Sequence, residues 1–341
     1  MSVMIRICLS LLALVFASPL YAQDAPASGF DPDAILALKG LQLLDQRLNA
    51  IGYRLAEANT PYCPRKAAQT GLLLHDIDQY PDPAVARFAL GFDRAVTIIA
   101  VAPDSPGGTA GLLPGDDILA INGMSIEDVP ADDPAFAKEP VEYRRIAAVN
   151  EMLDKVLVEA DATLDILRGG ERMKMTVASQ QACPSRFQIT VSEDRGASAD
   201  GKIVSVTSRM AEYFLNDDEF AAVVAHELAH NLLKHRNRLD AEEVNRGFFG
   251  QFGKSASQIK STEIEADRLS VWLMANAGYD PQAAIRFWTR YGKEHGKGIF
   301  SASTHYRWKK RVRLFQEEMK KMAATEPVNG KYAPPLLAGL D

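Results

Sequence analysis

Beyond residue 22 the chain lacks any apolar run of the about 18 residues that a membrane helix requires. It also lacks a basic stripe, because the 38 Lys and Arg residues are scattered and the net charge is −6. No internal repeat, low-complexity tract or disordered composition is present. We therefore expect no integral membrane segment and no nucleic-acid partner. What remains is a globular protein of 341 residues, long enough for two domains, in which 47% of the residues are hydrophobic.

The first residues have the form of a secretory signal. Arg6 provides the positive charge, and the apolar run that follows, residues 7–17, is too short for a stable membrane anchor. Ala22 is the expected residue before the cleavage site. We therefore expect residues 1–22 to be removed and the mature chain to be exported and soluble.

Export would leave two cysteines, Cys63 and Cys183, in an oxidising compartment. Two cysteines allow only one intramolecular pairing, so we expect them to be bonded to each other. The alternative is two unrelated buried thiols.

Three patterns follow one another along the mature chain. Apolar residues at spacings of three and four predict an amphipathic helix over 33–58, loosened at Gly40 and Gly52. Short strands and tight turns come next, with a hairpin signal at Asn122-Gly123. Two further strands then lead into long helices. The expected units are residues 1–22 as signal peptide, 31–62 as an N-terminal helix packed on the last domain, 71–182 as a β-rich domain, 184–325 as a mostly helical domain and 326–341 as a Pro-rich tail.

The β-rich segment contains its most specific motifs in the middle. These motifs are Ser105-Pro106, Ala110-Gly111-Leu112, Pro114-Gly115-Asp116 and Ile121-Asn122-Gly123. They resemble the PDZ domains of bacterial exported proteases. The resemblance implies a β-rich PDZ-like domain, and Cys63 and Cys183 bracket it, so that a bond between them would join the two ends of an inserted domain.

One stretch of this segment is similar to a ligand-binding loop. Leu90, Gly91 and Phe92 resemble the PDZ loop whose backbone N–H groups capture the terminal carboxylate of a peptide. The resemblance implies that these three residues bind substrate C-termini. The alternative is a PDZ-shaped spacer without a ligand, because a fold alone does not carry a function.

The helical segment contains a metal-binding pattern. Asn216 with Glu219 predicts a capped helix, and this helix carries His226-Glu227-Leu228-Ala229-His230. Two His four residues apart lie on one helical face and can bind one Zn²⁺ together. Glu227, beside the first ligand, is placed to act as the general base on a water molecule.

A catalytic zinc site normally has a third protein ligand. His235 would lie about 180° around a continuous helix from His226 and would face away, as a surface or second-layer residue. Glu263 is the better candidate. Asp267 is one turn further along the same face and can accept an N–H from a ligating His, whereas Glu265 should be solvated.

The whole metal pattern resembles a known family. It comprises His226-Glu227-x-x-His230, Glu263-x-x-Ala266-Asp267 and Ala277-Gly278-Tyr279-Asp280-Pro281. These motifs are similar to those of the M48 zinc metallopeptidases, which are gluzincins and include exported quality-control proteases of Gram-negative bacteria. The resemblance implies an α+β fold, with a mostly helical gluzincin peptidase domain that has a small edge sheet, plus the β-rich PDZ-like domain.

The resemblance also implies an activity. We expect one Zn²⁺ per chain and a periplasmic endopeptidase that cleaves unfolded or damaged exported proteins, with the PDZ-like domain recognising substrate C-termini. In gluzincins an edge strand pairs with the substrate, and here the strand over 202–207 is expected to fill that role. His305, in a stretch that resembles the family's Ser-x-His-Pro motif without its Pro, is a regulatory ligand, an oxyanion donor or only structural. The alternative function is a PDZ adaptor or chaperone with a structural or inhibited zinc site.

Overall fold

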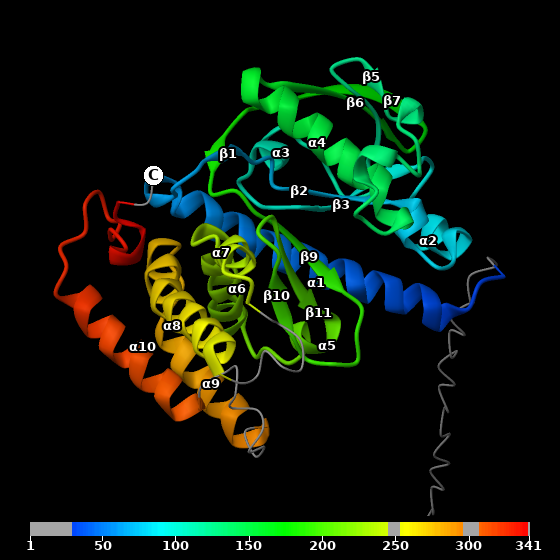
Figure 1. The fold of residues 1–341 in the computed structure, drawn as a ribbon. Helices are drawn as coiled ribbons and strands as arrows, with labels where there is room; N and C mark the ends of the chain where they lie inside the picture. The colour runs from blue at the N-terminus through cyan, green and yellow to red at the C-terminus, as the bar shows by residue number, and fades with distance from the viewer. Residues whose placement is uncertain (1–28, 245–252, 296–306, 340–341) are drawn as a thin grey trace, which may run out of the picture.

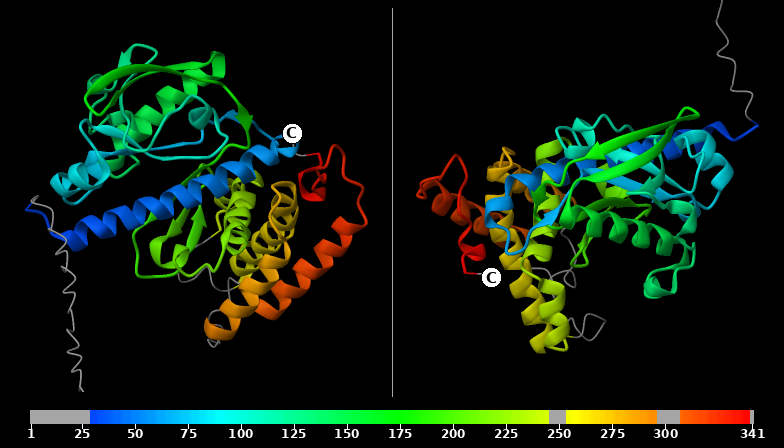
Figure 2. Two further views of the ribbon diagram at one scale, coloured as in Figure 1. Left: turned by 180° about the vertical axis from the view of Figure 1, so that it is seen from behind. Right: turned by 90° about the horizontal axis from the view of Figure 1, so that it is seen from above.

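A computed structural model of the chain describes residues 29–244, 253–295 and 307–339. The expected signal peptide, residues 1–22, lies outside them. The protein is of the α+β class, as the sequence predicts, with a β-rich part and a mostly helical part (Figure 1). Helix α1 (Pro32–Ala58) lies between the two parts and contacts elements of both (Figure 2).

Helix α1 is continuous over its whole length. The Asp31 side chain caps its first turn by accepting a backbone N–H at 3.0 Å. The helix passes through Gly40 and Gly52 without a break, so the expected loosening at these glycines is not observed. Gly52 lies where α1 crosses strand β9 (Arg186–Thr190), and a side chain there would overlap the ring of Phe187. Glycine at this position allows the helix to approach the strand closely.

The β-rich part is an antiparallel sheet with the strand order β2-β3-β4-β6-β7, and β5 pairs with β4. Asn122 and Gly123 both have positive φ and form the two-residue hairpin between β4 and β5 that the sequence predicts. Helix α4 packs Val149, Leu153 and Leu157 into the core of this sheet. The elements are β1 (Ala67–Ala68), β2 (Leu72–Asp76), α2 (Pro83–Leu90), β3 (Val96–Val101), α3 (Pro106–Thr109), β4 (Asp117–Ile121), β5 (Met124–Ser125), α4 (Arg144–Glu159), β6 (Ala162–Arg168), β7 (Glu171–Val177) and β8 (Gln181–Ala182).

The helical part has one large core to which α1, a small sheet and the later helices all contribute. Its largest fully buried side chains are Phe220, Trp272, Phe287 and Phe315. After β9 the elements are β10 (Ala197–Ala199), β11 (Ile203–Thr207), α5 (Ser208–Ala211), α6 (Asp217–Leu232), α7 (His235–Ala241), α8 (Gly253–Asn276), α9 (Gln282–His295) and α10 (Trp308–Ala323). Single 3-10 turns lie at Thr60–Tyr62, Ile77–Gln79, Ile126–Asp128, Pro134–Phe136, Val141–Tyr143 and Pro335–Leu337.

The small sheet differs from its prediction. Its order is β10-β11-β9, with β11 parallel to β9 and antiparallel to β10. The expectation that the strand over 202–207 is an edge strand is therefore wrong, because β11 is the central strand. Strand β10 is the edge that packs beside α6. A strand of three residues is too short to produce a periodicity that the sequence could reveal.

A narrow neck connects the β-rich part to α1. Cys63 and Cys183 form a disulfide there, as expected, although they are 120 positions apart in the sequence. Next to it, β1 pairs with β8 in the register Ala67↔Ala182, and the Cys183 N–H donates to the carbonyl of Ala56 at the end of α1. The two ends of the β-rich segment are thus fastened to each other and to the helix.

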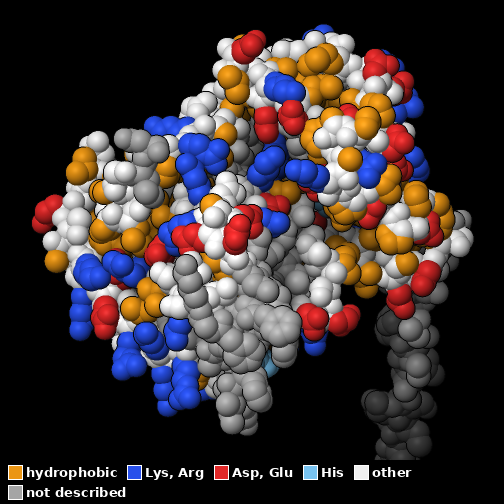
Figure 3. All heavy atoms as spheres, viewed as in Figure 1, with side chains coloured by type: hydrophobic (Ala, Val, Ile, Leu, Met, Phe, Trp, Pro, Cys, Tyr) orange, Lys and Arg blue, Asp and Glu red, His pale blue; other side chains and the backbone are white. Residues whose placement is uncertain are grey.

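On the face shown in Figure 3, Lys and Arg side chains gather over α10 at the lower left.

The C-terminal residues after α10 pack back onto α8, where Asn276 donates to the carbonyl of Tyr332 at 2.9 Å. Within the described part of the chain, no helix combines the length and the apolar character that a membrane span needs.

Candidate metal centre

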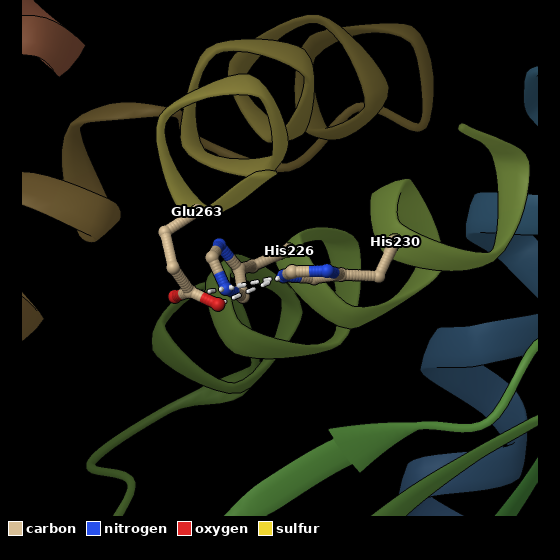
Figure 4. Close-up of side chains that lie close together, drawn as sticks. All are labelled: His226, His230 and Glu263. Carbon is tan, nitrogen blue, oxygen red and sulfur yellow. Dashed lines mark hydrogen bonds and ion pairs between the residues drawn. The ribbon is translucent and has the colours of Figure 1, made fainter. Parts of the chain in front are cut away.

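Helix α6 presents two imidazoles on one face (Figure 4). The helix begins as the sequence predicts, since the Asn216 side chain accepts the Glu219 N–H at 3.0 Å. His226 is 5% exposed and His230 is half-buried. Because the two residues are four apart, their rings lie one turn from each other, and their Nε2 atoms are 3.2 Å apart.

Helix α8 brings a carboxylate to these two nitrogens. Nε2 of His226 is 3.5 Å from one carboxylate oxygen of Glu263, and Nε2 of His230 is 3.5 Å from the other. Zinc ligands at about 2.1 Å in a tetrahedral arrangement would be about 3.4 Å from each other. The observed spacings are close to this value, and one ligand atom of each of the three residues lies within 4.8 Å of the other two, so that the two imidazoles and the carboxylate fit zinc as a donor set.

The carboxyl group of Glu263 is suited to a cation. Burial raises its pKa, but the hydrogen bond and charge of His226, together with the charges of His230 and Arg311, outweigh this and hold the pKa well below its usual range. The group is therefore ionised at neutral pH. An ionised carboxylate beside two imidazoles is the form that a divalent metal requires.

His226 is oriented from behind by a buried ion pair. Its Nδ1 lies 2.8 Å from Asp267, one turn after Glu263 on α8. The other oxygen of Asp267 accepts from Nε of Arg311 at 2.6 Å. Arg311 comes from α10, and its guanidinium lies 3.7 Å over the ring of Trp288. The sequence analysis did not identify Arg311. A signal was present, because Arg311 is four residues before the apolar Phe315, and so this charged residue lies on the apolar face of its helix.

His230 has a different kind of partner. Its Nδ1 is 2.9 Å from Nδ1 of His235, and Nε2 of His235 is 3.2 Å from Glu265. The expected position of His235 assumed a continuous helix, but α6 ends at Leu232 and Lys234 has a positive φ of 53°. His235 is in fact turned back into a second layer and is 1% exposed. The expectation that Glu265 is solvated is wrong, because it is half-buried and bonded to His235.

Glu227 is half-buried on α6 directly after His226. The pKa of its carboxyl is raised to about 7, and burial is the main cause. The charges of Glu263 and Asp267 also act to raise this pKa, whereas those of His226 and Arg311 act to lower it. A carboxyl group with a pKa near neutrality can both accept and return a proton. That property is the one expected of the general base.

Helix α6 is also bonded to the small sheet. Asn231, next to His230, accepts the N–H of Gly201 at 2.7 Å and donates to Ser185 at 2.7 Å. Gly201 lies in the turn between β10 and β11, and Ser185 precedes β9. The edge strand β10 therefore has a defined position beside α6.

The predicted carboxylate-binding loop has another structure. Leu90 is the last residue of α2, and Gly91 is its left-handed C-cap, whose N–H donates to the carbonyl of Arg87. Phe92 is 2% exposed in a small core. Leu90 and Gly91 therefore do not lie in an open loop, because Asp82 caps a helix over Pro83–Leu90 and the helix ends on glycine. His305 lies outside the described residues.

Comparisons with known proteins agree with the two parts of the chain. Residues 97–136 match the model of the PDZ domain, and residues 171–261 match the model of peptidase family M48. The second match ends before Glu263, so it does not include the third candidate ligand.

Similar curated proteins include several peptidases. The chain is 32% identical over 122 residues to mitochondrial metalloendopeptidase OMA1 of Schizosaccharomyces pombe, and the aligned region covers 30% of this chain and 36% of that protein. It is 26% identical over 222 residues to beta-barrel assembly-enhancing protease of Yersinia pestis, covering 56% of this chain and 44% of that one. A putative beta-barrel assembly-enhancing protease of Vibrio cholerae is 24% identical over 211 residues, covering 48% and 44%. The chain thus spans less than half the length of each of these relatives.

Proposed function

We propose that the chain is a zinc-dependent endopeptidase of unfolded or damaged exported proteins. The matches of residues 171–261 to peptidase family M48 and of residues 97–136 to the PDZ domain support this proposal. The observation that carries the proposal is the convergence of His226, His230 and Glu263: one ligand atom of each lies within 4.8 Å of the other two, and the Nε2 atoms of the two imidazoles are 3.2 Å apart. One zinc ion per chain fits these three ligand atoms. We assign residues 71–182 to the PDZ-like domain, and residues 31–62 with 184–325 to the peptidase domain.

Zinc bound there would supply Lewis acidity, which makes a water molecule more acidic and polarises the carbonyl group that it attacks. The chain supplies the remaining parts. Glu227 accepts the proton of the attacking water and returns it to the nitrogen of the leaving amine. Asp267 accepts the Nδ1–H of His226, so that Nε2 faces the metal position. Arg311 holds Asp267 in that orientation.

We propose that substrate binds along the outer edge of β10, which pairs only with β11 among the described residues. An extended peptide that adds a strand there would pair through main-chain hydrogen bonds, which depend little on side chains. The three residues of β10, Ala197–Ala199, have small side chains. Such binding selects chains that are unfolded, because a folded protein rarely offers an extended free segment.

The PDZ-like domain is proposed to assist by holding substrate C-termini against a free edge of its own sheet. The residues first expected for this role, at the end of α2, are not part of this proposal. A periplasmic location is supported by the disulfide between Cys63 and Cys183, which needs an oxidising compartment to persist.

The proposal is tested with Glu227→Gln, produced in an oxidising compartment. Zinc content should stay at one per chain in the variant, and cleavage of casein should fall by about 10²–10⁴-fold, because the proton acceptor is lost while the ligands are kept. Glu317→Gln, an exposed change on α10, is the matched control and should cleave at the wild-type rate. Equal residual cleavage by wild type and Glu227→Gln, or none by either, would instead support a PDZ adaptor or chaperone.

A further inference from the structure

A chain of hydrogen bonds leads away from the candidate metal centre on the side of His230. Nδ1 of His230 is 2.9 Å from Nδ1 of His235, and Nε2 of His235 is 3.2 Å from Glu265. Glu265 in turn accepts from Arg238 at 2.9 Å and from the hydroxyl of Ser261 at 3.2 Å. The chain joins three elements, α6, α7 and α8, and His235 within it is 1% exposed.

The positions of the hydrogens in this chain follow from the role of His230. If its Nε2 is to bind a metal, the neutral imidazole carries its hydrogen on Nδ1 and donates it to Nδ1 of His235. Nδ1 of His235 must then be an acceptor, so that its hydrogen is on Nε2 and is donated to Glu265. The reverse direction would put a hydrogen on Nε2 of His230, which is incompatible with ligation. The carboxylate of Glu265, which can only accept when ionised, makes this direction the favoured one.

We propose that His235, held by Glu265, is a positioning residue that fixes the tautomer and the ring orientation of His230. It has for His230 the role that Asp267 has for His226, with an imidazole in place of a carboxylate as the direct acceptor. This inference rests on the proposed zinc site. Partners of metal ligands at this distance typically change metal affinity by about 10–100-fold when they are removed.

Two substitutions at one position separate the hydrogen bond from packing. His235→Phe keeps a planar ring in the buried space but has no acceptor, whereas in His235→Asn the side-chain oxygen can take the place of Nδ1. The zinc dissociation constant, measured by chelator competition, should rise about 10–100-fold in His235→Phe and return close to wild type in His235→Asn. The visible spectrum of the cobalt-substituted protein should change in the first variant and be restored in the second.

Leu239→Ala is the matched control for packing. Leu239 is one turn further along α7 and 8% exposed, so its truncation should lower the melting temperature of the metal-free protein but leave zinc affinity and the cobalt spectrum unchanged. Glu265→Ala is measured in parallel, as a variant that keeps His235 in place. It should raise the zinc dissociation constant by about tenfold, because His235 loses the acceptor that sets its tautomer.

The outcomes distinguish this inference from the proposed function. Wild-type protein that binds zinc, together with His235→Phe and Glu265→Ala variants of unchanged affinity and unchanged cobalt spectrum, would overturn the inference and leave the peptidase proposal standing. Loss of affinity in Leu239→Ala equal to that in His235→Phe would also overturn it, because packing alone would then be the cause. Wild-type protein without zinc affinity would overturn both.

Discussion

Asp45 is a buried carboxyl group in α1, 4% exposed, and it accepts the backbone N–H of Ile189 in β9 at 2.8 Å. Burial raises its pKa from 3.8 to about 7, which the hydrogen bond from Ile189 only partly offsets. In the folded protein the group therefore holds its proton up to neutral pH, whereas in the unfolded chain it loses the proton near pH 4. The contrast with Glu263 and Asp267, which are buried beside imidazoles and a guanidinium, shows how the neighbours of a carboxyl group decide its charge.

The raised pKa of Asp45 predicts a pH dependence of stability. Between pH 3.8 and 7 the folded state binds more protons than the unfolded state, so the free energy of unfolding falls as pH rises through this range, and the loss is complete above pH 7. Asp45→Asn removes this term and keeps an acceptor for Ile189. From pH 5 to pH 8, the stability of the variant relative to wild type should therefore rise by about 2–3 kcal/mol, as measured by urea unfolding at each pH.

The control for this experiment is Asn49→Ala, a change of a neutral buried side chain one turn along α1. It should lower the free energy of unfolding by an amount that does not vary with pH, since no proton is bound or released. Parallel curves for wild type and Asp45→Asn would show that Asp45 is ionised in the folded protein and would contradict the prediction.

At the scale of elements, the crossing of α1 over β9 depends on one glycine. Gly52 faces Phe187, and a methyl group at this position would overlap the ring. Gly40 lies in the exposed part of the same helix, and no atom lies within 4 Å of the point that a methyl group would occupy there. The two glycines are thus equivalent in the isolated helix and different in the folded protein.

Substitution of both glycines separates helix propensity from packing. Gly40→Ala should raise the free energy of unfolding by up to about 1 kcal/mol, because alanine favours the helix. Gly52→Ala has the same local benefit but should lower the free energy of unfolding by about 1–3 kcal/mol, because the helix and the strand must move apart. Urea unfolding of the two variants tests this, and a stabilisation of equal size at both positions would refute the close approach of α1 to Phe187.

The placement of the functional elements was only partly readable from the sequence. The spacing of His226 and His230 and the single turn between Glu263 and Asp267 are local, and helical geometry alone places each pair on one face. The central position of β11 and the helix that ends at Leu90 were not predicted. The position of β11 depends on its pairing with the short edge strand β10. The helix that ends at Leu90 depends on its aspartate N-cap and on the glycine at its C-terminus.

At the scale of the whole molecule, the disulfide between Cys63 and Cys183 closes a loop of the chain that contains the entire β-rich part. Loops of this length have a large conformational entropy in the unfolded chain, and a cross-link removes part of it. The bond lies at the neck where β1 and β8 pair, beside the end of α1. It therefore connects the stability of the β-rich part to that of the helical part.

Reduction should lower the free energy of unfolding by about 4–5 kcal/mol, because the unfolded chain regains the freedom of the long loop. The measurement is thermal and urea unfolding with and without a thiol-free reductant, accompanied by mass spectrometry of the native protein. The double variant Cys63→Ala/Cys183→Ala should match the reduced wild type and should not respond to reductant. Free thiols in the native exported protein, or equal stability with and without reductant, would contradict the role assigned to this bond.

The sequence by itself determined the three candidate metal ligands and the helical faces on which they lie, because residues three and four apart are neighbours in any α-helix. The tertiary structure alone decided which side chains contact Nδ1 of each imidazole. Arg311 is 85 positions from His226, and Glu265 is 30 positions from His235. Such contacts depend on how α7, α8 and α10 pack against α6, and no local periodicity encodes the packing of one helix against another. The candidate ligands could therefore be named from the sequence, whereas the hydrogen bonds that orient them required the folded chain.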